Sequence, residues 1–289
     1  MDKAVAETGI GAGAPLSAPG GNEFVRGFVV VANRELTRLL HDRARMISSL
    51  AQPLMFFVIF GAGFSRMISS GNIASGVGFI QFLFPGIVAQ TVFMTSIFSG
   101  LSVVWDREFG FLRELLVAPI SRFGIVFGKV VGSSILAMIQ ATIIMLLAPL
   151  LHVKVTVGML ILLYPLLALV SITMSCFGIL LASRVRSQQA FKMIMQLVIF
   201  PMIFLAGIFF PLTNVPGWLA VISKFNPLTY GVDAVRHAFL DVATAGTAHA
   251  YGGVELFGHP VGVFNEAIIM AIAGLVMLLL ALRAFTKQE

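Results

Sequence analysis

Six long apolar stretches alternate with shorter polar segments along this chain, at residues 47–64, 79–104, 123–151, 157–183, 190–210 and 264–284. A helix needs about 20 mostly apolar residues to cross a hydrocarbon core of about 30 Å. A helix also satisfies its own backbone hydrogen bonds, as lipid demands. The pattern therefore predicts an all-α integral membrane protein with six transmembrane helices within residues 47–289.

Two amphipathic segments accompany these stretches. In residues 24–46 the apolar Phe24, Phe28, Val31, Leu36 and Leu39 are interspersed with arginines, which predicts an interfacial helix with its apolar face in the lipid. Between the second and third stretches, apolar side chains recur at helical spacing at Trp105, Phe109, Leu112 and Leu116. Charged residues occupy the remaining surface, and Pro119 follows. This second pattern predicts a short helix at about 105–118, roughly parallel to the membrane and facing the cytoplasm.

The segment before the last apolar stretch, residues 211–263, is too long to be a plain loop. Its apolar residues predict two short helices that form an outer re-entrant hairpin at about 211–245. Asn226 and Pro227 interrupt the apolar pattern and mark the break between the two helices. Trp218 and Tyr230 are suited to the membrane interface, where amphipathic rings settle.

Composition and charge agree with a membrane protein and set its orientation. Hydrophobic residues make up 58% of the chain and charged residues only 11%. About fifteen basic residues lie on one side of the predicted spans, and the other side has only four, Arg66, Lys154, Lys224 and Arg236. The positive-inside rule then places both termini in the cytoplasm. Residues 1–23, rich in Gly, Ala and Pro, are expected to form a disordered cytoplasmic tail. The net charge of +6 suits anionic lipid head groups, and the dispersed basic residues do not indicate nucleic-acid binding.

The search for chemistry gives mainly negative expectations. The sequence contains no phosphate-binding loop of the kind that follows a strand. No candidate nucleophile has a histidine base within the predicted spans, so we expect no catalytic residues. The five histidines never recur at the spacing that places two of them on one helix face, so we expect no metal site. Lys129 and Lys192 lie near cytoplasmic span ends, where they can snorkel. No carboxylate lies at a membrane centre, so transport against a gradient would need another energy source.

Two motifs are similar to those of a known family. Asp106-Arg107-Glu108-x-Gly110-x-x-x-Glu114, continuing through Pro119 to Arg122, resembles the signature of the type-2 class of ABC-transporter permeases. That class includes daunorubicin-resistance, nodulation and polysaccharide export permeases. Phe210-Pro211-Leu212, Pro216-Gly217-Trp218-Leu219 and Asn226-Pro227-Leu228-Thr229-Tyr230 resemble the family's segment before the last span. At Phe111-Leu112-Arg113 the side-chain charge differs from that of the family pattern.

The resemblance implies a transport subunit without an ATPase site or cofactor of its own. Two ABC ATPase subunits would bind ATP and Mg, and a second permease chain, identical or closely paralogous, would complete the assembly in lipid. It implies a multi-pass protein of a prokaryotic inner or plasma membrane. The implied ATPase-coupling residues are Asp106, Arg107, Glu108, Phe109, Gly110, Arg113, Glu114, Arg34 and Arg38. The implied outer gate comprises Trp218, Asn226, Pro227 and Tyr230.

The side chains within the predicted spans indicate the chemical class of the cargo. The candidate substrate path comprises Phe93, Met94, Phe98, Gln140 and Gln196, because flexible apolar surfaces suit varied apolar cargo. Packing against lipid or a neighbouring helix is the alternative for each of these residues. We expect export of a hydrophobic drug-like or lipid-like substrate. Export of a polysaccharide or glycolipid, and transport by a gradient-driven carrier, are the alternatives.

Overall fold

The computed structural model describes residues 21–41, 43–68, 79–110, 122–151, 155–185, 187–212, 215–243, 253–256 and 259–286. The helices are α1 (Gly21–His41), α2 (Arg43–Ile68), α3 (Phe79–Ile97), α4 (Ser99–Glu108), α6 (Arg122–Met145), η1 (Ala148–Leu151), α7 (Val157–Arg184), α8 (Gln188–Leu205), α9 (Gly217–Phe225), α10 (Pro227–Ala243) and α11 (Val263–Thr286). Two short antiparallel strands, β1 (Glu255–Leu256) and β2 (His259–Pro260), are the exception to the predicted all-α fold within these residues.

Five helical segments of the described chain are long and apolar enough to cross a membrane. They are Phe79–Glu108, Phe123–Met145, Val157–Arg184, Gln188–Leu205 and Val263–Ala284. The remaining predicted span, at residues 47–64, lies within α2, but the apolar part of α2 covers only Leu50–Gly61. The structure therefore supports a membrane-embedded helical protein, and the sixth span stays a prediction.

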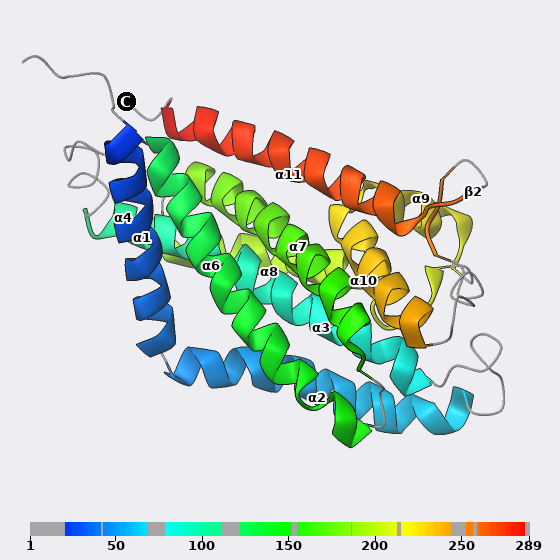
Figure 1. Ribbon diagram of the computed structural model, residues 1–289. Coiled ribbons are helices and arrows are strands. Elements are labelled where there is room, and N and C mark those ends of the chain that lie inside the picture. The colour runs from blue at the N-terminus through cyan, green and yellow to red at the C-terminus, as the bar shows by residue number, and fades with distance from the viewer. Residues whose placement is uncertain are drawn as a thin grey trace, which may run out of the picture.

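Helix α7 lies at the centre of the bundle and contacts α3, α4, α6, α10 and α11 (Figure 1). Serine pairs join it to its neighbours: Ser171 Oγ lies 2.7 Å from Ser96 Oγ of α3, and Ser175 Oγ lies 2.8 Å from Ser133 Oγ of α6. Hydrogen bonds between small polar side chains are a common means of helix association in lipid. These contacts hold α3 and α6 against the same face of α7.

The N-terminal helix differs from the predicted interfacial helix at residues 24–46. It ends at His41, and α2 begins at Arg43. Part of its apolar face packs on α6, where a methyl group added at Gly128 would lie 3.0 Å from Val31 Cβ and 3.1 Å from Phe28 O. Phe28 and Val31 thus bury apolar surface against protein rather than lipid. The α1 helix, α4 and the C-terminal end of α11 lie at one end of the bundle, while α9 and β2 lie at the other (Figure 1).

The predicted outer hairpin contains two helices that meet at Asn226, in agreement with the sequence pattern. Most of α10 is buried, and it packs against α3, α7 and α11. Asn226 explains the break, because its side-chain Oδ1 accepts a hydrogen bond from Leu228 N at 3.1 Å, as N-cap residues do. Arg236, one of the four basic residues predicted on the outer side, is buried, and its Nη2 donates to Gly207 O at 2.8 Å.

Candidate functional site

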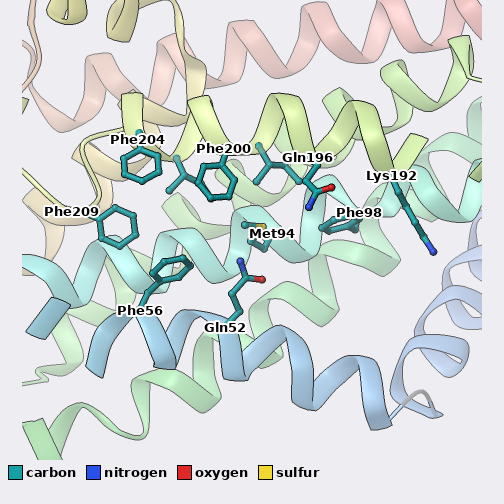
Figure 2. A pocket seen from close by; sticks show the side chains of 11 residues that line it. Gln52, Phe56, Met94, Phe98, Lys192, Gln196, Phe200, Phe204 and Phe209 are labelled. Atoms are coloured by element: carbon teal, nitrogen blue, oxygen red, sulfur yellow. The ribbon is translucent and has the colours of Figure 1, made fainter. Parts of the chain in front are cut away.

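A cavity of about 440 Å³ lies between α2, α3 and α8 (Figure 2). Its volume falls in the range of roughly 300–1,000 Å³ that is typical of small-molecule sites. The lining is mostly aromatic and aliphatic, and the residues are Gln52, Phe56, Met94, Phe98, Lys192, Gln196, Ile199, Phe200, Ile203, Phe204 and Phe209. The cavity can hold an apolar molecule of moderate size.

Three of the five residues predicted for the substrate path meet in this cavity, namely Met94, Phe98 and Gln196. The other two lie elsewhere. Phe93 is fully buried in the core, and the amide oxygen of Gln140 accepts a hydrogen bond from Thr95 Oγ1. Helix periodicity explains the separation of neighbours, since adjacent residues such as Phe93 and Met94 point about 100° apart.

The polar groups of the cavity are not spread evenly. Lys192 lies at one end, and Phe204 and Phe209 lie at the opposite end (Figure 2). Gln52 and Gln196 lie between these ends. The cavity lining contains no carboxylate among the described residues. This gradient from a cationic to an aromatic end suits an amphipathic molecule with a polar or acidic head.

The C-terminal end of α4 carries a buried ionic cluster. Asp106 is 4% exposed and accepts hydrogen bonds from Arg34 Nη2 at 3.1 and 2.9 Å and from Lys129 Nζ at 2.6 Å. Lys129 is fully buried and also donates to Ser102 Oγ at 2.9 Å. The expectation that Lys129 snorkels is therefore wrong, because its ammonium group is neutralised inside the bundle. The cluster joins α1, α4 and α6.

The two residues after Asp106 bond to the turn between α7 and α8. Arg107 Nη1 donates to Val185 O at 3.0 Å and to Ser183 O at 3.4 Å. Glu108 Oε2 accepts from Gln188 N at 3.3 Å, at the first residue of α8. A carboxylate at a helix N-terminus is favoured by the helix dipole and by the free backbone N–H groups there. The end of α4 is thus bonded to α1, α6, α7 and α8.

The predicted helix at 105–118 ends at Glu108 in its described part, and residues 111–118 lie outside the described residues. Trp105 to Glu108 belong to α4, which continues from the second span and ends before Phe109. Gly110 has φ of +76°, a left-handed conformation that commonly ends helices. Phe109 is 77% exposed at this end. Arg113 and Glu114 lie outside the described residues, as does the side chain of Arg38.

The hairpin of α9 and α10, predicted to lie on the outer side, bonds to the other end of α8. Asn226 Nδ2 donates to Met202 O at 2.8 Å, and Thr229 Oγ1 donates to Leu205 O at 3.2 Å. Leu205 O is one of the carbonyl groups that the last turn of a helix leaves without a partner, while Met202 O also accepts a hydrogen bond from Ala206 N. Pro227 begins α10, and Tyr230 Oη donates to Lys224 O at 2.9 Å across the break. Trp218 is 65% exposed on α9, whereas Asn226 and Tyr230 are buried, and the gate role of these residues stays a prediction.

Sequence comparison assigns this architecture to a family. Residues 26–240 match the family model described as ABC-2 type transporter. The chain belongs to the ABC-2 type transporter family. This result confirms the resemblance to type-2 ABC permeases that the motifs around Asp106 and Asn226 indicated.

Two of the following three relatives of this ABC-2 type chain are named as permeases. It is 32% identical over 260 residues to "Putative transport permease ycf38" of Cyanophora paradoxa, which covers 89% of this chain and 88% of the relative. It is 30% identical over 164 residues to "Probable multidrug ABC transporter permease YbhR" of Escherichia coli (strain K12), covering 56% of this chain and 45% of that protein. "Nodulation protein J" of Rhizobium meliloti (strain 1021) is 27% identical over 199 residues, or 68% of this chain and 74% of the relative.

The sequence did not predict which side chains and backbone groups bond to Asp106 and Glu108 of the motif. Lys129 bonds to Asp106, and Gln188 bonds to Glu108, yet both lie in other segments of the chain. Ser102 of α4 accepts a second hydrogen bond from Lys129. A lysine several residues inside an apolar stretch was the available signal, because an ionisable residue there usually has a partner. The cavity residues Phe56 and Phe209 lack a comparable signal, since the spans contain many phenylalanines.

Proposed function

We propose that this chain is the membrane subunit of an ATP-driven exporter. Two permease chains would pair with two separate ATPase subunits, which bind ATP and Mg and supply the energy. The assembly would lie in the inner or plasma membrane of a prokaryote, with both termini of the permease in the cytoplasm. Membership of the ABC-2 type family supports this assignment.

The observation that carries the mechanism is the position of α8. This helix lines the cavity from Lys192 to Phe204. Its first residue is bonded to Glu108 of α4, and its last turn is bonded to Asn226 and Thr229 of the outer hairpin. A force on the end of α4 would therefore move the cavity wall and the outer hairpin together. An ATPase would have to shift the equilibrium between two arrangements of such an element in order to open the cavity alternately to the two sides of the membrane.

The cavity favours an amphipathic, lipid-like or drug-like cargo. Its aromatic end would bury an apolar tail, and Lys192 would attract a polar or acidic head. A sugar polymer would need more polar groups than Gln52, Gln196 and Lys192 provide. Carriers driven by a cation gradient usually hold a carboxylate on the path, and the lining residues include none. Polysaccharide export and gradient-driven transport are therefore less well supported.

A tryptophan in the cavity tests this assignment. Gln196→Trp places a large ring into the cavity from an exposed position on α8, so it should block cargo without disturbing the core. We expect ATP-dependent transport of a fluorescent lipid analogue to fall at least about tenfold in proteoliposomes that contain the cognate ATPase.

Met193→Trp is the matched control, because Met193 is 68% exposed on the same helix and does not line the cavity. It should keep transport near the wild-type rate. Equal transport by the two variants would remove the cavity from the path.

A further inference from the structure

Three buried metal-binding side chains converge at the end of the bundle opposite α4. Asp233 and His237 project from α10, and Glu266 projects from the first turn of α11. One ligand atom from each lies within 4.8 Å of the others. All three residues are buried, and Glu266 is fully so. Figure 1 shows α10 beside the start of α11, near β2.

The hydrogen bonds within this group leave capacity for a ligand. Glu266 Oε1 is buried and has no hydrogen-bond partner, although buried carboxylate oxygens are normally satisfied. Glu266 Oε2 lies 3.4 Å from His237 Nδ1, which is long for a charge-assisted hydrogen bond. Two ligands bound to one tetrahedral zinc ion at about 2.1 Å lie about 3.4 Å apart. The pair thus has the spacing of two zinc ligands.

The surroundings fix the ligands in place. Asp233 Oδ2 accepts a hydrogen bond from Val254 N at 2.6 Å, which orients the carboxylate as an outer-shell donor does in metal sites. Gly253 packs closely, since an added Cβ would lie 2.7 Å from Asp233 Oδ2 and 2.8 Å from His237 Cε1. Gly253 and Val254 also line a pocket of about 380 Å³ with Lys224 and Thr229. That pocket therefore lies beside the segment that contacts Asp233 and His237.

The charges also favour a cation. Two carboxylates are buried together, and removing such groups from water is costly unless they are neutralised. The neighbouring Arg236 supplies one positive charge to this region, but its Nη2 donates to Gly207 O and its Cζ lies 3.9 Å from the Phe82 ring centroid. A divalent ion held by one imidazole and two carboxylates would neutralise the cluster.

We infer that Asp233, His237 and Glu266 form a binding site for a divalent transition-metal ion of the zinc type. The ion joins α10, α11 and the Gly253–Val254 segment, and so stabilises the outer hairpin. The sequence search missed this site because it compared only histidine pairs. Asp233 and His237 are four residues apart on one helix face, and Glu266 joins them only in the fold.

The test uses the full chain, purified in detergent with its affinity tag removed and treated with a chelator. Zn²⁺ is then added, with Co²⁺ as a spectroscopic probe and Ca²⁺ and Mg²⁺ as competitors. We expect one high-affinity Zn²⁺ per chain, a Co²⁺ absorption band typical of low coordination number, and a rise of about 5 °C in the unfolding midpoint at saturating Zn²⁺. No stoichiometric Zn²⁺, or binding of Ca²⁺ and Mg²⁺ in preference to it, would overturn the assignment.

Substitutions of the proposed ligands test where the ion binds. Glu266→Gln and His237→Gln should each lower Zn²⁺ affinity at least about tenfold and abolish the thermal shift. His41→Gln removes an exposed imidazole on α1 and should change neither property. Unchanged binding in both site variants would refute the site. If the site variants fail to fold, X-ray absorption of the wild-type zinc complex decides, because the site requires a single imidazole, and two or more would contradict it.

Discussion

Asp106→Asn should cause one of the largest losses of stability available to a single substitution in this chain. The change leaves the fully buried Lys129 ammonium without its carboxylate, and Arg34 loses the same partner. Breaking a buried ion pair by removing one partner costs about 3–5 kcal/mol. We expect the unfolding midpoint in detergent to fall by about 10 °C and the yield of monodisperse protein to fall with it.

Two further variants test whether the loss of stability comes from the buried charge or from any change within the motif. Glu108→Gln changes an exposed carboxylate two residues away and should have little effect on the midpoint. The double variant Asp106→Asn with Lys129→Gln removes both charges and should recover more than half of the loss. If Asp106→Asn is no more costly than Glu108→Gln, the cluster does not anchor α4.

Gly178→Ala should be similarly harmful, because α7 touches the α3–α4 junction through backbone atoms. A methyl group on Gly178 would overlap Ile97 O, and one on Gly100 would overlap Gly178 O. These neighbours are backbone atoms and cannot rotate away as a side chain can. Overpacking costs about 1–3 kcal/mol when side chains can move, so we expect about 3 kcal/mol or more in the free energy of unfolding.

Gly158→Ala is the control, since it makes the same change on the same helix with no atom within 4 Å of the added methyl group. Helix propensity predicts a neutral or slightly stabilising effect there. Thermal unfolding followed by tryptophan fluorescence compares the two. Equal midpoints would contradict the close approach of α7 to the α3–α4 junction.

The sequence predicts the helices well because lipid imposes a simple rule on them. Apolar length located α3 with α4, α6, α7, α8 and α11, and the Asn226-Pro227 pair located the break between α9 and α10. The end of α4 at Glu108 was missed, although Gly110 was a signal for it. The apolar stripe from Trp105 to Leu116 favoured a continuous helix, and the stripe alone says nothing about the left-handed turn.

The site was harder to predict because its parts are distant in sequence. Asp106 and Lys129 are 23 residues apart, and Glu108 contacts Gln188 at a separation of 80. Such contacts depend on how the helices pack, which periodicity does not determine. Met94 and Gln196 were chosen by residue type and do share a cavity, whereas Phe93, one position from Met94, lies in the core. The ATPase-coupling roles stay predictions for all nine residues, Arg34, Arg38, Asp106, Arg107, Glu108, Phe109, Gly110, Arg113 and Glu114.

Transport in proteoliposomes tests the central claim, that this chain is moved by a partner ATPase through α4. The purified chain is reconstituted with and without its cognate ATPase, and the movement of a fluorescent lipid analogue is followed with ATP or with a proton gradient alone. The account predicts transport only when the ATPase and ATP are both present, and no loss when the gradient is collapsed. Transport by the chain alone under a gradient, or ATP hydrolysis by the chain alone, would contradict it.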